Sequence, residues 1–448
     1  MTDLFAAAVV LVTFVLIIRG AEVRFALLCA GAILVIAAGR PDEWFIAFGT
    51  SMTQAGLITV ILPALGFTAV IRLGKCDLHL VRCLVQPLLK MRAVIIPSAM
   101  IATMLIAIAI TSAAGVAAAV GVVLIPALVA LGVSPAMAAA TMIAGTWGAA
   151  FSPGSPHPAL IGDMAGVPVM DVILAHLKAS VPAVAVYAVV LYFVARMLGE
   201  DGSRPPARED SAPVPAAPAS GSTAAAAVPA AGDGATTDEP VNLLRAAMPL
   251  LPLLLLIVGL PQLGLLTPWL PKGVSVLQAM VVGTVATMLV ARLSPAKASK
   301  AFFDGMGEAY AGVMGIIIAA GVFIAGLSAI GSIDHLITAL KQTKAVAPIA
   351  AMVGPFAIAV LSGSGDAAAI AFNKAMLPHA ELLGMTKVAL GDIAWVGSAL
   401  GRGMSPVAAA TAIAAGYAGV SVFDIAKRTA LPAIAAAAVV VALMTLLA

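Results

Sequence analysis

Long apolar runs recur along almost the whole chain. An apolar helix of about 20 residues crosses roughly 30 Å of hydrocarbon, and helices satisfy their own backbone hydrogen bonds in lipid. The pattern therefore predicts an all-α polytopic membrane protein with five crossings in each half. These are expected near residues 4–18, 23–39, 54–72, 135–165 and 180–196, and near 245–261, 273–291, 307–329, 387–417 and 429–447.

Two further apolar segments, 93–131 and 346–383, carry a polar turn near the middle. Each is interpreted as a re-entrant hairpin, and two full crossings are the alternative. Both readings return the chain to the same side of the membrane, so charge patterns do not separate them.

The two halves of the chain resemble each other in four places, in the same order and about 250 residues apart. Such self-similarity indicates a structural repeat, and an odd number of crossings per half makes the two repeats inverted. The matched pairs are Leu73–Leu80 with Ile330–Ile337, Thr111–Gly115 with Ser362–Asp366, Gly154–Pro156 with Met404–Pro406, and Gly166–Val172 with Gly419–Ile425.

The repeat divides the chain into three parts. The first membrane repeat covers 1–199, with hairpin 93–131 and broken helix 135–165. A stretch rich in Ala, Pro, Ser and Gly at 200–240 is typical of a flexible linker. The second membrane repeat covers 241–448, with hairpin 346–383 and broken helix 387–417.

Composition supports a membrane protein and excludes several other classes. Hydrophobic residues make up 62% of the 448 positions and charged residues only 10%, whereas a soluble domain is about a quarter charged. The three cysteines form no CxxC pair, and no histidines stand at metal-ligand spacing, so we expect no disulfide framework, structural metal or cofactor. Nucleic acid is not an expected partner.

The distribution of Lys and Arg predicts the orientation. Most of them, including Arg19, Arg72, Arg196 and Arg428, fall on one side of the predicted crossings. By the positive-inside rule this side is cytoplasmic. The linker is then cytoplasmic, both termini are periplasmic, and the expected location is the bacterial inner membrane.

Four polar interruptions lie at mid-membrane depth, at 111–115, 152–158, 362–366 and 401–406. Irregular backbone is tolerated there only where it lines a cavity. Each interruption starts a half-helix whose N-terminus attracts an anion, while carbonyls and hydroxyls suit a small cation. The candidate substrate-binding residues are Thr111, Ser112, Ser155, His157, Ser362, Gly363, Ser364, Arg402 and Ser405. The candidate coupling-ion residues are Ser112, Gly154, Ser364, Asp366 and Gly403.

Charged residues inside the predicted membrane segments sharpen this hypothesis. Arg402 is costly in a membrane unless it has a partner or a task, and its planar fork can hold a carboxylate; a structural ion pair or carbonyl cap is the alternative. Asp366 is a candidate Na⁺ ligand or proton carrier, or the N-cap of the following helix. Lys374, Asn373 and Asp163 are candidates for the translocation pathway.

Several of these motifs resemble a known family. Gly363–Ala369 with Phe372–Ala375, and Gly145–Trp147 followed by Ser152–Ser155, are similar to anaerobic four-carbon dicarboxylate carriers of the DcuC type. These belong to an ion transporter superfamily that includes divalent anion/sodium symporters. The resemblance implies a homodimer, an elevator mechanism and a succinate, fumarate or malate cargo. The symporters' Ser-Asn-Thr hairpin motif is absent here, which leaves Na⁺ coupling, H⁺ coupling and exchange all open.

Other functions remain alternatives at this stage. The chain could carry another organic anion, such as a monocarboxylate, citrate, gluconate or a short-chain fatty acid, or exchange Na⁺ for H⁺. A channel fits paired broken helices less well than alternating access does. An intramembrane hydrolase would use Ser155 and His157, but no oriented acid or metal accompanies them. We therefore expect a carrier of a small organic anion in the lipid bilayer, with no catalytic residues.

Overall fold

The computed structural model describes residues 2–19, 21–88, 94–202, 240–263, 265, 273–333 and 346–447. Regular structure in these ranges is helical, apart from one isolated bridge between Val133 and Asp201. Five of the described helices are long and apolar enough to cross a membrane. The predicted all-α membrane class is thereby confirmed. The linker predicted over 200–240 falls outside the described residues except at its two ends.

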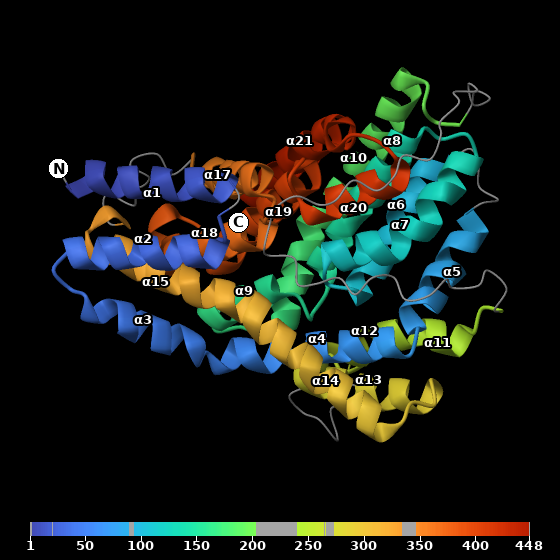
Figure 1. The fold of residues 1–448 in the computed structure, drawn as a ribbon, viewed down its shortest axis with the longest axis horizontal. Coiled ribbons are helices and arrows are strands. Elements are labelled where there is room, and N and C mark those ends of the chain that lie inside the picture. The colour runs from blue at the N-terminus through green and yellow to red at the C-terminus, as the bar shows by residue number, and fades with distance from the viewer. Residues whose placement is uncertain are drawn as a thin grey trace.

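The first half contains ten α-helices and one 3₁₀ helix in the described ranges (Figure 1). Their bounds are α1 Thr2–Ile18, α2 Val23–Ala37, α3 Asp42–Met52, α4 Ala55–Leu73, α5 Cys76–Leu88, α6 Ile95–Ala109, α7 Ala113–Ala130, α8 Pro135–Gly145, η2 Thr146–Phe151, α9 Pro156–Ala165 and α10 Val169–Leu198.

The second half follows a similar order of helices and breaks. The described elements are α11 Leu243–Ala247, η3 Met248–Leu250, α12 Leu251–Val258, η4 Pro261–Leu263, α13 Val276–Val290, α14 Pro295–Ala309, the π-helical turn η5 Tyr310–Met314, α15 Gly315–Ala329, α17 Ala347–Ser362, α18 Gly365–Met376, η7 Leu377–Leu383, α19 Lys387–Met404, α20 Ala409–Ala418 and α21 Val422–Leu447.

Two predicted crossings are parts of longer helices, and one observed helix was not predicted. The crossing expected at 180–196 is part of α10, which begins at Val169, and the one expected at 307–329 is part of a helical run that begins at Pro295. Helix α3 was not predicted. In each case polar residues, such as His176 in α10 or Lys300 in α14, interrupt the apolar run without interrupting the helix.

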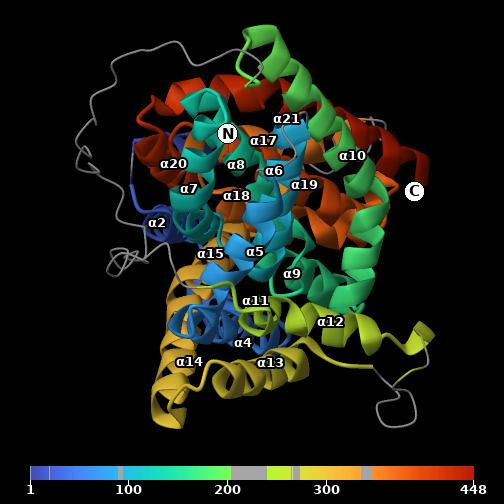
Figure 2. The same ribbon diagram turned by 90° about the vertical axis from the view of Figure 1, so that its right-hand side faces the viewer.

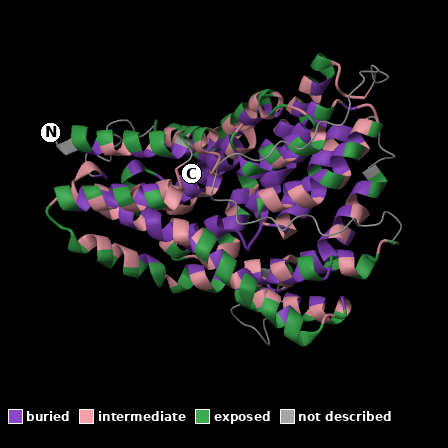
Figure 3. Ribbon diagram, in the orientation of Figure 1, coloured by how far each residue is buried: buried purple, intermediate pink, exposed green. Residues whose placement is uncertain are grey.

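Buried side chains form two separate hydrophobic cores. The first core joins α6–α10 with α17–α21, around residues such as Met100, Leu124 and Trp395. The second core joins α1, α2 and α4 with α12–α15, around residues such as Leu34 and Phe67. Helices α9 and α18 contribute buried residues to both cores. Figures 1 and 2 show α4, α13 and α14 together on one side of the molecule, with α6–α8 and α19–α21 on the other. Buried positions are concentrated between the helices and exposed ones on the outer faces (Figure 3).

Each core combines helices from both halves of the sequence. In the first core α10 packs on α21, and α7 packs on α20; in the second α4 packs on α13 and α14, and α2 packs on α15. Neither half therefore has a complete core of its own, and the two halves must fold together.

The close packing of α17 on α19 depends on two glycines one helical turn apart. A Cβ added at Gly397 would lie 2.4 Å from the Met352 carbonyl oxygen, and one added at Gly401 would lie 2.3 Å from that of Phe356. Small residues at this spacing let helix backbones approach closely within membranes.

Replacing Gly401 by alanine should therefore destabilise the protein. The added methyl would push α19 away from the α17 backbone, at a cost of roughly 1–3 kcal/mol, as for other overpacked interiors. Gly403→Ala is the matched control, because a Cβ there meets nothing within 4 Å. Thermal unfolding in detergent should show a lowered Tm for Gly401→Ala and an unchanged or slightly raised one for Gly403→Ala; equal Tm values would contradict the packing argument.

Candidate functional site

Serine caps begin the half-helices that follow both hairpin turns. In the first turn, Ile110–Ser112 is extended, and Ser112 Oγ accepts the Gly115 N–H at 3.2 Å. In the second, Ser364 Oγ accepts the Ala367 N–H at 3.3 Å. Such caps satisfy donors that a helix N-terminus leaves unpaired. Ser364 therefore has the N-cap role that was one alternative for Asp366.

The two broken helices end differently. In the first, η2 ends at Phe151, and α9 begins with Pro156, which needs no backbone donor at this position. In the second, α19 ends at Met404, and Ser405 Oγ donates to the Val360 carbonyl oxygen at 2.7 Å. This bond ties the second break to α17, beside the second hairpin turn.

A small polar pocket lies where these breaks meet. It contains five predicted site residues from four separate segments: Thr111, Ser155, His157, Asp366 and Arg402. The N-terminal ends of α9 and α18 and the turn before α7 face it, and the C-terminal part of α19 closes it. The N-terminus of α20 does not line it, so three helix starts converge here rather than the four suggested by the sequence.

His157 and Asp366 join the two halves across this pocket. His157 Nε2 lies 2.9 Å from Asp366 Oδ1. The His157 side chain is 4% exposed and that of Asp366 is 45% exposed. The histidine is thus held in the protein, whereas the carboxylate remains accessible from the pocket. The sequence alone did not identify Asp366 as the partner of His157.

Arg402 supplies the positive charge of the pocket. Its Nε is buried and has no hydrogen-bond partner. Asp366 lines the same pocket and acts on the guanidinium electrostatically, but its ion-pair contact is with His157. Within the described chain, the Arg402 guanidinium therefore lines the pocket without a hydrogen bond or close ion pair of its own.

The remaining predicted residues lie outside the pocket lining. Ser112 and Ser364 act as caps; Ser362 Oγ accepts the Ser364 N–H at 3.2 Å. Gly363 has a φ of 72°, in the left-handed region that favours glycine. Gly403 and Ser405 lie at the second break, and Asn373 Nδ2 points to the Gly391 carbonyl oxygen at 3.5 Å.

Lys374 and Asp163 lie where the two cores meet. Lys374 Nζ donates to the Ile317 carbonyl oxygen at 3.0 Å and to Ser51 Oγ at 3.3 Å. Asp163 approaches the start of α4 so closely that a Cβ at Gly56 would lie 2.0 Å from its Oδ1. Both residues thus connect first-core helices to second-core helices, at a distance from the pocket lining.

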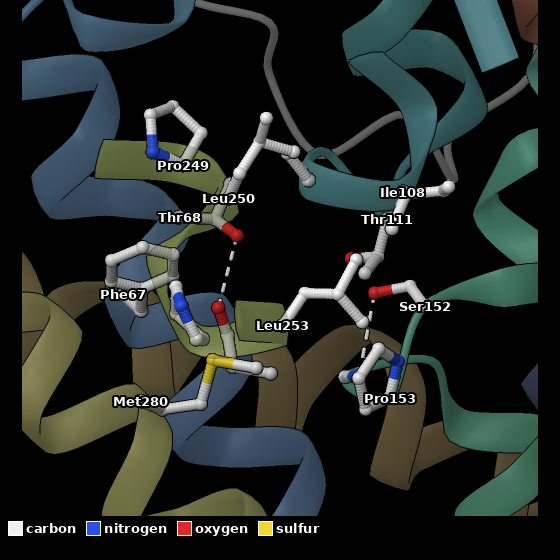
Figure 4. A pocket seen from close by; sticks show the side chains of 14 residues that line it. Phe67, Thr68, Ile108, Thr111, Ser152, Pro153, Pro249, Leu250, Leu253 and Met280 are labelled. Carbon is white, nitrogen blue, oxygen red and sulfur yellow. Dashed lines mark hydrogen bonds between the residues drawn. The ribbon is translucent and has the colours of Figure 1, made fainter. Parts of the chain in front are cut away.

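A second crevice separates the two cores beside the first hairpin turn. Figure 4 shows Thr111, Ser152 and Pro153 on one side of it and Phe67 and Met280 on the other. Gly154 also lines it. Thr111 lines both cavities, so the crevice lies next to the polar pocket. The lining of the crevice is mostly apolar.

Sequence analysis missed the α19 wall of the pocket. Trp395, Ser398 and Ala399 line it one to two turns before Arg402. The signal was present, since one helical face carries 395, 398, 399 and 402, but only the Gly- and Pro-rich breaks were considered.

An all-helical membrane-spanning bundle with a polar pocket at its helix breaks defines a multi-pass membrane transport protein. The comparisons identify the family. Residues 1–448 match the model of the DcuC family, described as a C4-dicarboxylate anaerobic carrier, and the chain belongs to this family. It is a carrier of the inner membrane rather than an enzyme.

Relatives with curated names agree with this assignment. A Haemophilus influenzae protein named only as an uncharacterised transporter is 40% identical over 283 residues, which cover 62% of this chain and 94% of that protein. The anaerobic C4-dicarboxylate transporter DcuC of Escherichia coli K12 is 33% identical over 142 residues, about 31% of either chain. The match to the named dicarboxylate transporter thus covers less than a third of its length.

The contact between His157 and Asp366 should contribute to stability. Hydrogen bonds to charged groups contribute more than neutral ones, but Asp366 is nearly half exposed, so solvent screening reduces the coupling to about 1 kcal/mol. A double-mutant cycle of His157→Phe and Asp366→Asn, followed by unfolding in detergent, would measure it. Additive effects of the two substitutions would show that the contact is not energetically significant.

Proposed function

We propose that this protein is a secondary transporter of a C4-dicarboxylate such as succinate, fumarate or malate. Family membership supports the substrate class. The observation that carries the proposal is that Arg402 lines a pocket faced by helix N-termini and has no hydrogen bond or close ion pair in the described chain. A guanidinium binds one carboxylate in two parallel hydrogen bonds, and the helix starts attract the other.

An elevator mechanism is the proposed route across the membrane. The first core, with the pocket, would move as a transport domain against the second core as a scaffold. The separation of the two cores supports this division. The crevice between the two cores is mostly apolar, and Lys374 makes only a few polar contacts across the interface. Such an interface would allow one core to slide against the other. Lys374, Asn373 and Asp163 keep their proposed place along the path.

The orientation and assembly remain proposals as well. We propose inverted repeats, periplasmic termini, a cytoplasmic linker and a homodimer formed through the scaffold. The repeated order of hairpin, broken helix and long final helix supports the repeats. We propose that transport of the anion is driven by a Na⁺ gradient, by an H⁺ gradient or by exchange for an internal anion. Ser112, Gly154, Ser364, Asp366 and Gly403 are the proposed ion-site residues.

Transport of succinate by the purified full-length protein in proteoliposomes tests the substrate. Uptake of labelled succinate should be driven by an imposed Na⁺ gradient, by an imposed pH gradient or by unlabelled internal succinate. Stimulation by one of these would identify the coupling. No uptake with any of them, in protein shown to be folded, would reject succinate as a cargo; parallel assays with gluconate and lactate would then test other organic anions.

Arg402→Ala should greatly weaken succinate binding. Removing one partner of a desolvated charged contact costs about 2–5 kcal/mol, which corresponds to a loss of affinity of about thirtyfold or more. Arg402→Lys should restore part of the binding, because it keeps the charge and loses the fork. Arg196→Ala is the matched control, since this arginine lies at the exposed end of α10 and pairs with Asp201. Unchanged affinity in Arg402→Ala would refute the assigned role.

A further inference from the structure

A second polar cluster lies inside the first core, behind the wall of the pocket. Asp392 on α19 and His176 on α10 are fully buried, and Asp392 Oδ1 lies 3.8 Å from His176 Nδ1. Among the described residues, neither carboxyl oxygen of Asp392 has a hydrogen-bond partner, and neither has His176 Nε2. Neither side chain lines the pocket. The substrate site therefore does not explain these two residues.

An ionised Asp392 would be a bare charge in this position. At 3.8 Å the two side chains are too far apart for a hydrogen bond, and His176 Nδ1 is instead 3.2 Å from Ser180 Oγ. A buried carboxylate without donors or a close cation is strongly unfavourable, whereas a neutral carboxylic acid is tolerated. The burial and the missing partners thus point to a protonated Asp392 beside a neutral imidazole.

Two charged groups on neighbouring helices, Lys374 and Arg428, have contacts away from Asp392. In the described residues, α17 and η2 carry no titratable side chain. On α18, Lys374 contacts Ser51 and Ile317; on α21, Arg428 pairs with Glu200. The other titratable or charged residues on the helices packed against Asp392 are Lys387 and Arg402 on α19, His157 and Asp163 on α9, Asp171, Lys178, Tyr187, Tyr192 and Arg196 on α10, Asp366 on α18, His379 and Glu381 on η7, and Asp424 and Lys427 on α21.

Aromatic stacking connects the buried pair to the pocket. The ring of Trp395 lies 4.6 Å from that of His176 and 5.5 Å from that of His157, with interplanar angles of 23° and 30°. His157 in turn contacts Asp366. One indole ring therefore separates the buried pair from the polar side chains that face the substrate. A change of charge on Asp392 acts on the pocket over a short distance through low-dielectric surroundings.

We infer that Asp392 is a proton-binding site whose proton is carried together with the substrate anion. Release of the proton converts the carboxylic acid into a carboxylate and adds one negative charge behind the pocket. That charge repels a dicarboxylate, so the anion binds more tightly when Asp392 is protonated, and by linkage the anion favours protonation. The inference rests on the proposed dicarboxylate transport and names the coupling ion and the group that holds it.

Transport assays with Asp392→Asn test this coupling. The amide imitates the protonated acid but releases no proton. We expect it to keep exchange of labelled external for unlabelled internal succinate and to lose accumulation driven by a pH gradient. Asp304→Asn is the matched control, because Asp304 is an exposed residue on α14 paired with Lys300. If Asp392→Asn does not fold, Asp392→Leu keeps the test available, since an apolar side chain of similar size removes two buried oxygens that have no hydrogen-bond partner among the described residues.

Infrared spectroscopy tests the proton site without any substrate. The purified wild type at neutral pH should show a protonated-carboxyl C=O band that is missing in Asp392→Asn and in Asp392→Leu and is retained in Asp304→Asn. Absence of this difference would overturn the inference, as would accumulation driven by a pH gradient in either Asp392 variant. A wild type that shows the band but transports no succinate would reject the proposed cargo and leave the proton site standing.

Discussion

The central constraint on this structure is that a broken helix inside a membrane leaves backbone groups that lipid cannot satisfy. At each of the breaks near 110–112, 152–155, 363–364 and 405–408, at least one polar group is paired within the protein. Serine hydroxyls cap the helices after both hairpin turns, and Ser405 bonds to α17. Because the breaks must be shielded from lipid, they gather in the first core. The polar pocket follows from this gathering.

The same constraint explains why the pocket needs both halves of the chain. His157 comes from the first half, and Asp366 and Arg402 come from the second. Helices from the two halves also pack on each other in both cores. Substrate contacts and folding therefore depend on the same association. In the described residues, the second core has no comparable set of serine-capped breaks facing a pocket, which supports its proposed role as a scaffold.

The sequence predicted the class, the main breaks and much of the pocket, because Gly, Pro and Ser clusters in apolar runs have few structural explanations. It did not predict Trp395 or Ser398, since no Gly- and Pro-rich break marks α19 before Gly401. It also missed His176 and Asp392, which are far apart in sequence and become partners only through packing of α10 on α19. Such long-range pairs are not visible in a single sequence.

The interpretation of 93–131 and 346–383 as re-entrant hairpins remains a prediction. Helix lengths support it more strongly for the second hairpin than for the first. Helix α18 has 12 residues, or about 18 Å at 1.5 Å per residue, which is too short to cross the membrane alone. Helix α7 has 18 residues and qualifies as a candidate span by length and composition. Re-entry is therefore better supported for the second hairpin than for the first.

Charge balance in the pocket supports the proposed coupling of substrate to a cation. Arg402 and Asp366 contribute opposite charges, so their sum is close to zero. Three helix starts add roughly half a positive charge each, which does not fully balance a dianion. A further negative charge on Asp392, one ring behind His157, would increase the deficit. The loaded pocket is therefore close to neutral only when this buried carboxyl keeps its proton, and movement of a charged pocket through the membrane would be costly.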